Sequence, residues 1–318
     1  MEPARRDPGR AAALAREGEE ARRLGDLDRA RERFREAARL DPEAAGHFVG
    51  WGAAARALDR FPEALEALER ARSLAAKDPR ALYELGETLR LLGRTKESHE
   101  ILDEAFRLDP TKGALAYSLA LSLADLGRPA EAVPILKDVL RRAAVPDAEA
   151  PVRFLLSRCL EDSGQAGEAR AERARFSRIA LLEAEVRKAA TLVEADPEGA
   201  SAHLALAAAL RRAGRLPEAH ESYLACARLD ARNARAAGGA ALCRALLAPG
   251  PEALAEAEAQ ARGALALGET AEARAALGSI AGRRGDLSAS REHLARALSL
   301  AAEDPHIEDL AGKAGLSR

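Results

Sequence analysis

Aromatic residues are scarce in this chain of 318 residues, where they make up 3%, although hydrophobic residues as a whole make up 47%. Ala and Leu therefore carry most of the apolar content, and both are strong helix formers. The β-branched and aromatic residues that a sheet needs are few. We expect an all-α fold.

The chain also lacks an excess of charge of either sign. Its 49 basic residues oppose 51 acidic ones, which leaves a net charge of −2. A dedicated nucleic-acid-binding protein usually shows a basic excess or a basic stripe, because it must neutralise phosphates. We therefore expect no nucleic-acid partner.

Motifs for metal binding, disulfides and common catalytic sites are missing as well. The three cysteines are far apart and form no Cys-x-x-Cys, and the six histidines form no His-x-x-x-His. No Gly-x-x-x-x-Gly-Lys-Ser/Thr or Gly-x-Ser-x-Gly occurs. The acidic residues alternate with Arg on expected helices, as solvated faces do. The sequence thus predicts no enzyme activity, no cofactor and no metal site.

No uncharged apolar run of 18 residues occurs, and the N-terminus has no apolar core of the kind that a signal peptide needs. We expect a soluble, reduced, cytoplasmic protein without a membrane segment. Residues 1–10 contain Pro3, Pro8 and Gly9 and are expected to form a disordered lead-in.

What the sequence has instead is a period of 34 residues. Gly25, Gly93 and Gly127 fit this period, and the missing copy falls at Asp59. Two further series, one of small and one of larger apolar residues, keep the same interval: Ala30, Ala64, Ser98 and Ala132, then Phe34, Leu68, Leu102 and Leu136. Three agreeing series indicate a repeat architecture.

In period and residue pattern the chain resembles the tetratricopeptide repeat family. The resemblance implies a right-handed superhelical solenoid of about eight helix–turn–helix repeats with a C-terminal capping helix. Small residues at positions 8, 20 and 27 of each unit leave room where paired helices cross, and larger ones would overpack. The expected divisions are a lead-in at 1–10, four regular units at 11–146, a linker, degenerate unit and extended helix at 147–199, three further units at 200–304, and the capping helix and tail at 305–318.

The second half departs from the pattern by 16 extra residues. Residues 168–195 contain no Gly or Pro and have apolar residues at helical spacing, so they predict one helix of about 28 residues. Such a helix either packs along the next unit as a spacer or projects as an arm for self-association or partner docking. The sequence leaves both open.

In proteins that resemble this one, positions 2, 5, 9 and 12 of each unit face the concave groove. Tyr83, Tyr117 and Phe154 all fall at position 5 and would form an aromatic row flanked by Arg. The alternative is that some groove candidates pack against a neighbouring helix and never meet a ligand. The residues expected to line the groove are Val49, Arg56, Tyr83, Glu87, Arg90, Tyr117, Leu121, Phe154, Arg158, Leu204 and Arg211.

The sequence therefore predicts a non-catalytic scaffold or adaptor that binds a protein or peptide, with an acidic peptide carrying apolar anchors as the best guess. Two alternatives stay open: RNA binding through Arg56, Arg90 and Arg211, and a role as the regulatory subunit of an enzyme. Co-chaperones of the family hold a chaperone tail with a clamp of Lys, Asn and Arg. The only Asn here is Asn233, so that clamp is missing.

Overall fold

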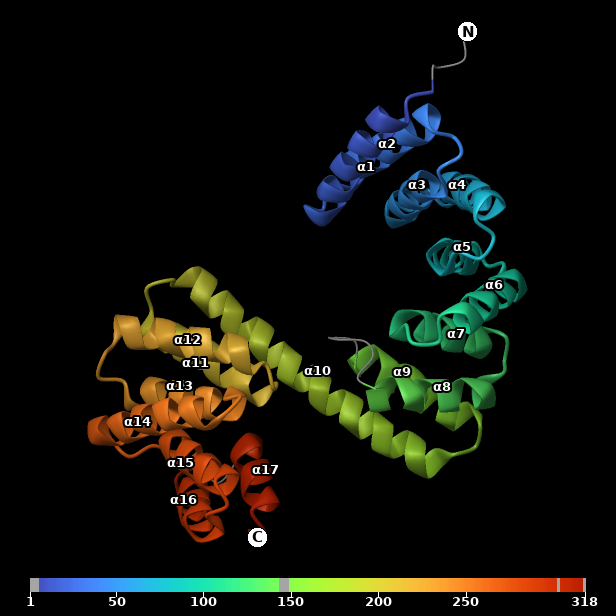
Figure 1. Ribbon diagram of the computed structural model, residues 1–318. Helices are drawn as coiled ribbons and strands as arrows, with labels where there is room; N and C mark the ends of the chain where they lie inside the picture. Colours follow the sequence, from blue (N-terminus) through green and yellow to red (C-terminus); the bar gives the residue numbers. More distant parts are fainter. Residues whose placement is uncertain (1–5, 143–148, 302–303, 317–318) are drawn as a thin grey trace. The chain divides into compact units, whose positions relative to one another are not determined.

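The computed structural model describes residues 6–142, 149–301 and 304–316. These residues contain seventeen α-helices and no strand, which confirms the all-α prediction (Figure 1). The helices are α1 Pro8–Arg23, α2 Leu27–Leu40, α3 Ala45–Ala57, α4 Phe61–Leu74, α5 Pro79–Leu91, α6 Thr95–Leu108, α7 Gly113–Asp125, α8 Pro129–Arg142, α9 Glu149–Asp162, α10 Ala166–Ala195, α11 Ala200–Arg212, α12 Leu216–Leu229, α13 Ala234–Leu247, α14 Pro251–Leu267, α15 Ala271–Arg283, α16 Leu287–Leu300 and α17 Pro305–Lys313.

The helices form two compact units, and the division between them falls inside α10. Unit 1 ends at Phe176, and unit 2 begins at Ser177. In unit 1 the pairs α1/α2, α3/α4, α5/α6 and α7/α8 pack internally, and α9 follows them. In unit 2 the pairs are α11/α12, α13/α14 and α15/α16, with α17 last. α10 is one uninterrupted helix of 30 residues, and it covers the predicted range 168–195.

In four pairs, α1/α2, α3/α4, α5/α6 and α15/α16, a glycine of the first helix closely approaches an apolar side chain of the second. A side-chain carbon added at Gly52 would lie 2.4 Å from Leu68 Cγ, and one added at Gly86 would lie 2.6 Å from Leu102 Cγ. Only glycine leaves room for the Leu side chain at these crossings. In the third pair, Ser98 Oγ also donates a hydrogen bond of 2.8 Å to the Gly86 carbonyl. The predicted role of the small residues is thus seen directly.

The turns within the pairs depend on a left-handed backbone residue, except in α13/α14. Gly25, Gly93, Gly127, Gly164, Gly214 and Gly285 all have φ between 71° and 85°. Asp59 takes this position in the α3–α4 turn with a φ of 57°, and among the described residues it is the one non-glycine with positive φ. Asp tolerates this conformation better than most side chains. Asp59, at the place where the glycine series lacks a glycine, therefore forms the turn as the glycines do.

The ends of the predicted segments differ in detail. α1 already begins at Pro8, inside the expected lead-in 1–10, because Asp7 caps it by accepting a hydrogen bond of 2.9 Å from the Arg10 amide. Residues 1–5 of the expected lead-in lie outside the described residues, as do residues 147–148 at the start of the expected linker.

Candidate functional site

The first helices of the pairs in unit 1 follow one another along the same side of the stack. Figure 1 shows α1, α3, α5, α7 and α9 lining one side, with α2, α4, α6 and α8 on the other. Each first helix contacts the next one in this series. We call the surface that these five helices share the inner surface of unit 1.

Two tyrosines lie on neighbouring helices of the inner surface. Tyr83 of α5 and Tyr117 of α7 are both half-buried, so each ring packs against the core and keeps part of its surface exposed. Burial raises the pKa of Tyr83, and the carboxylates of Glu87 and Glu84 raise it further. Burial also raises the pKa of Tyr117, against the opposing effect of Arg90. Both phenols therefore stay neutral and can donate a hydrogen bond at physiological pH.

Phe154 of α9 continues the row and is its most open member. Its side chain is 47% exposed, and its ring centroid lies 5.3 Å from that of Phe176 at an interplanar angle of 49°. Such tilted aromatic pairs are favourable. Leu121 of α7 is half-buried, and Arg158 lies exposed one turn beyond Phe154. The sequence analysis did not single out Phe176, which the structure places against Phe154.

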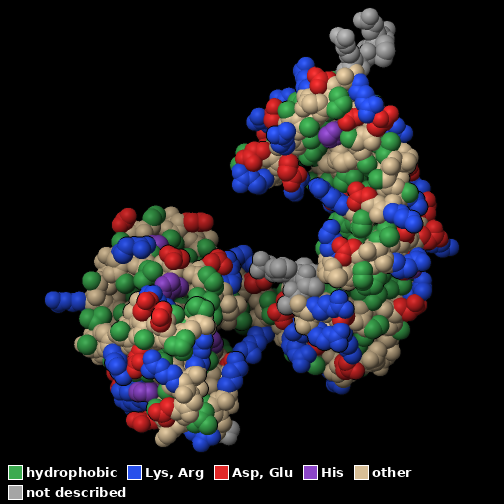
Figure 2. All heavy atoms as spheres, in the orientation of Figure 1, with side chains coloured by type: hydrophobic (Ala, Val, Ile, Leu, Met, Phe, Trp, Pro, Cys, Tyr) green, Lys and Arg blue, Asp and Glu red, His purple; other side chains and the backbone are tan. Residues whose placement is uncertain are grey.

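Two arginines of the inner surface, Arg56 and Arg90, are already paired. Arg56 of α3 donates hydrogen bonds of 3.0 Å and 2.8 Å to Glu84 Oε2 of α5. Arg90 donates from Nη2 to Glu87 Oε2 at 3.2 Å, and this pairing raises the Arg90 pKa in spite of burial. The visible face of unit 1 accordingly shows acidic and basic side chains interspersed (Figure 2). Because Arg56 and Arg90 are paired with glutamates, they no longer favour an acidic ligand.

Glu84 is the residue of this surface that the sequence analysis missed. It falls at position 6 of its unit, one residue outside the positions expected to face the groove. Its partner Arg56 lies 28 residues earlier, in the preceding unit. A pairing between neighbouring units has no local pattern, and only the stacking of α3 on α5 reveals it.

Two of the expected groove residues, Val49 and Arg211, are almost fully buried. Val49 is 1% exposed, because α3 packs it together with Phe48 and the small residues Ala71 and Ala81. Arg211 of α11 is also 1% exposed and forms a buried ion pair with Asp304 in unit 2. Neither side chain offers area to a ligand in this conformation.

The remaining candidates divide between the two units. Glu87 is 8% exposed and forms an ion pair with Arg90, so little of its side chain is open to a ligand. Leu204 of α11 is half-buried and packs against the core of unit 2. Two of these candidates, Leu204 and Arg211, lie on unit 2. The others with exposed or half-buried side chains lie on unit 1: Arg56, Tyr83, Arg90, Tyr117, Leu121, Phe154 and Arg158.

Residues 15–50 and 117–177 match the family model described as tetratricopeptide repeat. The chain carries tetratricopeptide repeats. Residues 57–139 match a second model, that of the anaphase-promoting complex, cyclosome, subunit 3. Both matches lie within residues 15–177, so they cover the tetratricopeptide repeats whose first helices build the inner surface. The resemblance inferred from the 34-residue period is confirmed.

Several solved structures are similar to the chain at low identity. The MamA protein matches at 17% identity over 52% of this chain and 89% of that chain, with a TM-score of 0.46. YrrB, a TPR protein with an unusual peptide-binding site, matches at 20% over 64% and 95%, with a TM-score of 0.39. The first TPR of Spaghetti (RPAP3) bound to the HSP90 peptide SRMEEVD matches at 19% over 39% and 98%, with a TM-score of 0.38. No curated protein matches the chain.

Two further features are absent from the described residues. No group of three or more His, Cys, Asp or Glu side chains in that part of the chain is arranged to hold a metal ion. None of the helices in the same residues combines the length and the apolarity that crossing a bilayer requires.

Proposed function

We propose that the chain is a non-catalytic adaptor whose inner surface on unit 1 binds a segment of another protein. The observation that carries this proposal is the aromatic row. Tyr83, Tyr117 and Phe154 occupy the same repeat position on α5, α7 and α9, and all three keep exposed area. Aromatic side chains dominate the binding energy of many interfaces, because they offer large apolar area at little entropic cost.

The charge pattern suggests what kind of segment fits. Arg56 and Arg90 are paired with Glu84 and Glu87, so a strongly acidic ligand would have to break ion pairs that the chain has already formed. We therefore favour a segment with apolar anchors for the aromatic row and little net charge. The same pairing weakens the RNA alternative, since phosphates would compete with carboxylates for each guanidinium.

A random peptide library displayed on phage tests the proposal. Peptides enriched on the wild-type chain are synthesised and titrated by fluorescence polarisation against wild type, Tyr117→Ala and Phe154→Ala. We expect each variant to lose at least about tenfold in affinity, which corresponds to about 1.4 kcal/mol.

The matched control is Leu108→Ala on α6, an exposed apolar residue on the second-helix side of unit 1. It should bind the enriched peptides as wild type does. If the aromatic variants keep wild-type affinity while their circular dichroism is unchanged, the inner surface is not the binding surface.

Self-association through α10, which the sequence left open, stays a prediction. Leu181 and Leu192 on α10 are both exposed, and their spacing of 11 residues places them on one face of the helix. Sedimentation velocity of wild type and Leu181→Glu over a range of concentrations measures it. A concentration-dependent increase in mass that the variant lacks would support a role for this face.

A further inference from the structure

Unit 2 contains a buried cation that joins two distant parts of the chain. Arg211 of α11 donates from Nη1 to Asp304 Oδ1 at 3.3 Å, and Nη2 donates to the other carboxylate oxygen. Its Nε donates to the Tyr223 hydroxyl at 3.3 Å. The two charged partners are 93 residues apart in sequence. A buried guanidinium needs such partners, because an unpaired charge in the interior is strongly destabilising.

Asp304 has two tasks at this point. It is the N-cap of α17 and accepts hydrogen bonds from the His306 and Ile307 amides at 3.0 Å and 3.2 Å. Burial alone would raise its pKa, but the Arg211 guanidinium and these amides outweigh burial and hold the pKa below its usual value. Asp304 is therefore ionised in its contact with Arg211 of α11.

A close approach between α13 and α15 makes this contact possible. A side-chain carbon at Gly238 of α13 would lie 2.9 Å from the Ala273 backbone nitrogen of α15. The two helices thus pack nearly backbone to backbone, and Arg235 of α13 adds a hydrogen bond of 3.4 Å to Glu272 of α15. Because the first helices come so close here, α17 at the end of the stack also contacts α11.

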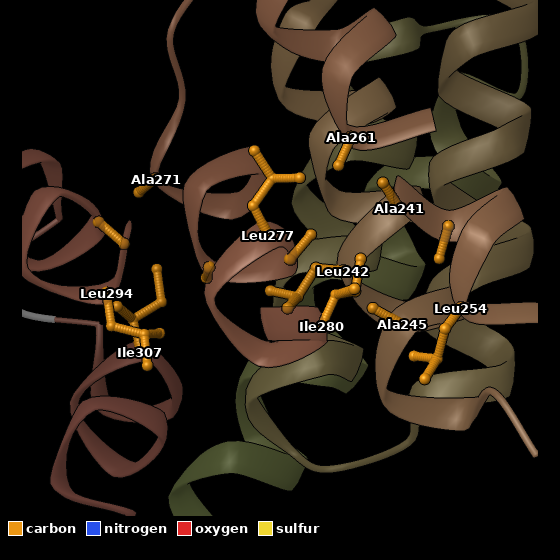
Figure 3. Packing of buried hydrophobic residues seen from close by; sticks show 14 of the residues in the cluster. Ala241, Leu242, Ala245, Leu254, Ala261, Ala271, Leu277, Ile280, Leu294 and Ile307 are labelled. Carbon is orange, nitrogen blue, oxygen red and sulfur yellow. The ribbon is translucent and has the colours of Figure 1, made fainter. Parts of the chain in front are cut away.

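The apolar side of α17 is held by the last helix pair. Ile307 and Ala311 are fully buried in one cluster with Ile280, Leu294 and Ala297. Figure 3 shows the Ile307 side chain beside Leu294. α17 is nine residues long, and a helix this short is unstable by itself in water. It owes its structure to the surface that binds it.

Space remains beside the docked helix. A cavity of about 570 Å³ opens next to α17 and is lined among others by Arg178, Arg212, His306 and Asp309. The contact between α17 and α11 is therefore narrow and bordered by solvent on one side. The other contacts of this segment are few: Arg211 Nη1 lies 3.4 Å from His306 Nδ1, and Arg291 Nε donates a hydrogen bond of 2.9 Å to the Ala314 carbonyl. A short helix held by one apolar cluster and these few polar contacts can leave such a surface without unfolding the helices beneath it.

We propose that α11, α15 and α16 form a helix-binding surface in unit 2, that α17 occupies it in the same chain, and that α17 of a second copy can take its place. The ligand chemistry is a short helix with an Asp N-cap for Arg211 and apolar residues three and seven positions later. An exchange of identical elements makes the same contacts in both arrangements, so it needs no new surface. The proposal involves unit 2 alone and does not depend on the function proposed for unit 1.

A labelled peptide with the sequence of residues 304–316 is the probe. It is titrated by fluorescence polarisation against the full-length wild-type chain and against Ile307→Asp, in which the chain's own α17 is displaced. We expect Ile307→Asp to bind the peptide at least about tenfold more tightly than wild type. A peptide with Asp304→Asn keeps a good N-cap but loses the charge, and it should bind at least about tenfold more weakly.

Leu287→Asp is the matched control, because Leu287 is an exposed apolar residue on α16. This variant should behave as wild type. If Ile307→Asp retains its helical circular dichroism and still binds the peptide no better than wild type, the surface is a fixed part of the core and the proposal is wrong.

Hydrogen exchange of the wild-type chain decides the question should Ile307→Asp fail to fold. We expect the amides of α17 to exchange at least tenfold faster than those of α11 and α15, because α17 leaves while the others remain folded. Exchange of all three helices at one common rate would overturn the proposal.

Discussion

Asp59 and Gly93 hold the same left-handed backbone conformation in equivalent turns of neighbouring repeats, with φ of 57° and 74°. Gly93 has no atom within 4 Å of the place where a Cβ would stand, so the conformation and not the available space selects glycine there. Asp59 adopts the same φ with a side chain that must tolerate it. The two turns therefore differ in strain and not in geometry.

Asp59→Gly should stabilise unit 1 by up to about 1 kcal/mol, because it removes the left-handed penalty of a side chain. Gly93→Ala should destabilise it by about 1 kcal/mol for the same reason. Urea denaturation followed by circular dichroism measures both changes. Destabilisation by both substitutions would contradict the assignment of strain to Asp59.

The same glycine-to-alanine change should have opposite signs at two other positions. At Gly86 the new methyl group would meet Leu102, and overpacking costs about 1–3 kcal/mol, more than the helix propensity gained. At Gly263, within α14, a Cβ meets nothing within 4 Å, so the change should stabilise by up to about 1 kcal/mol. Denaturation midpoints of Gly86→Ala and Gly263→Ala test this contrast, and equal shifts would refute it.

Glu63 links two neighbouring pairs of unit 1 and should make its stability depend on pH. It accepts a hydrogen bond of 2.7 Å from Trp51 Nε1 and one of 3.0 Å from Arg31 Nη1. Burial raises the Glu63 pKa, but these two donors outweigh burial, and the pKa lies below its usual value of 4.5. Because the folded pKa is lowered, the stabilisation is present above pH 4.5 and is lost as the pH falls through the folded pKa.

Glu63→Gln should therefore destabilise the chain by about 1–2 kcal/mol near neutral pH, and the difference from wild type should shrink toward pH 3. Urea denaturation of both chains at several pH values measures it. A difference that stays constant over this range would show that the charge of Glu63 is not the stabilising element.

The three thiols should be inert while the chain is folded. Cys159, Cys226 and Cys243 are all buried, and burial raises the pKa of each, that of Cys243 to about 12. The thiolate is the reactive form, and here it is both rare and shielded. A chromogenic disulfide reagent at pH 8 should react slowly with the native chain and at once with three thiols in guanidinium. Rapid labelling of the native chain would contradict the burial.

Sequence could predict the features that repeat. The 34-residue interval located the turn at Asp59, the glycine at position 8 and the apolar residue it faces, since each repeat solves the same local packing problem. It could not predict that Val49 is covered by its neighbours, because burial there depends on the small size of Ala71 in the same pair and of Ala81 in the next pair. The sequence could not predict the pairing of Arg211 with Asp304 either, since the two residues are 93 positions apart and meet only through the packing of the helices between them.

That long-range pair limits how unit 2 can grow. In unit 1 each described helix pair touches only its neighbours, so a further repeat could in principle be inserted without disturbing distant residues. In unit 2 the distance from Arg211 to Asp304 holds only for the present number of helix pairs between them. A duplication there would separate the buried guanidinium from its carboxylate. Lengthening by duplication is therefore open to the first half of this chain and closed to the second.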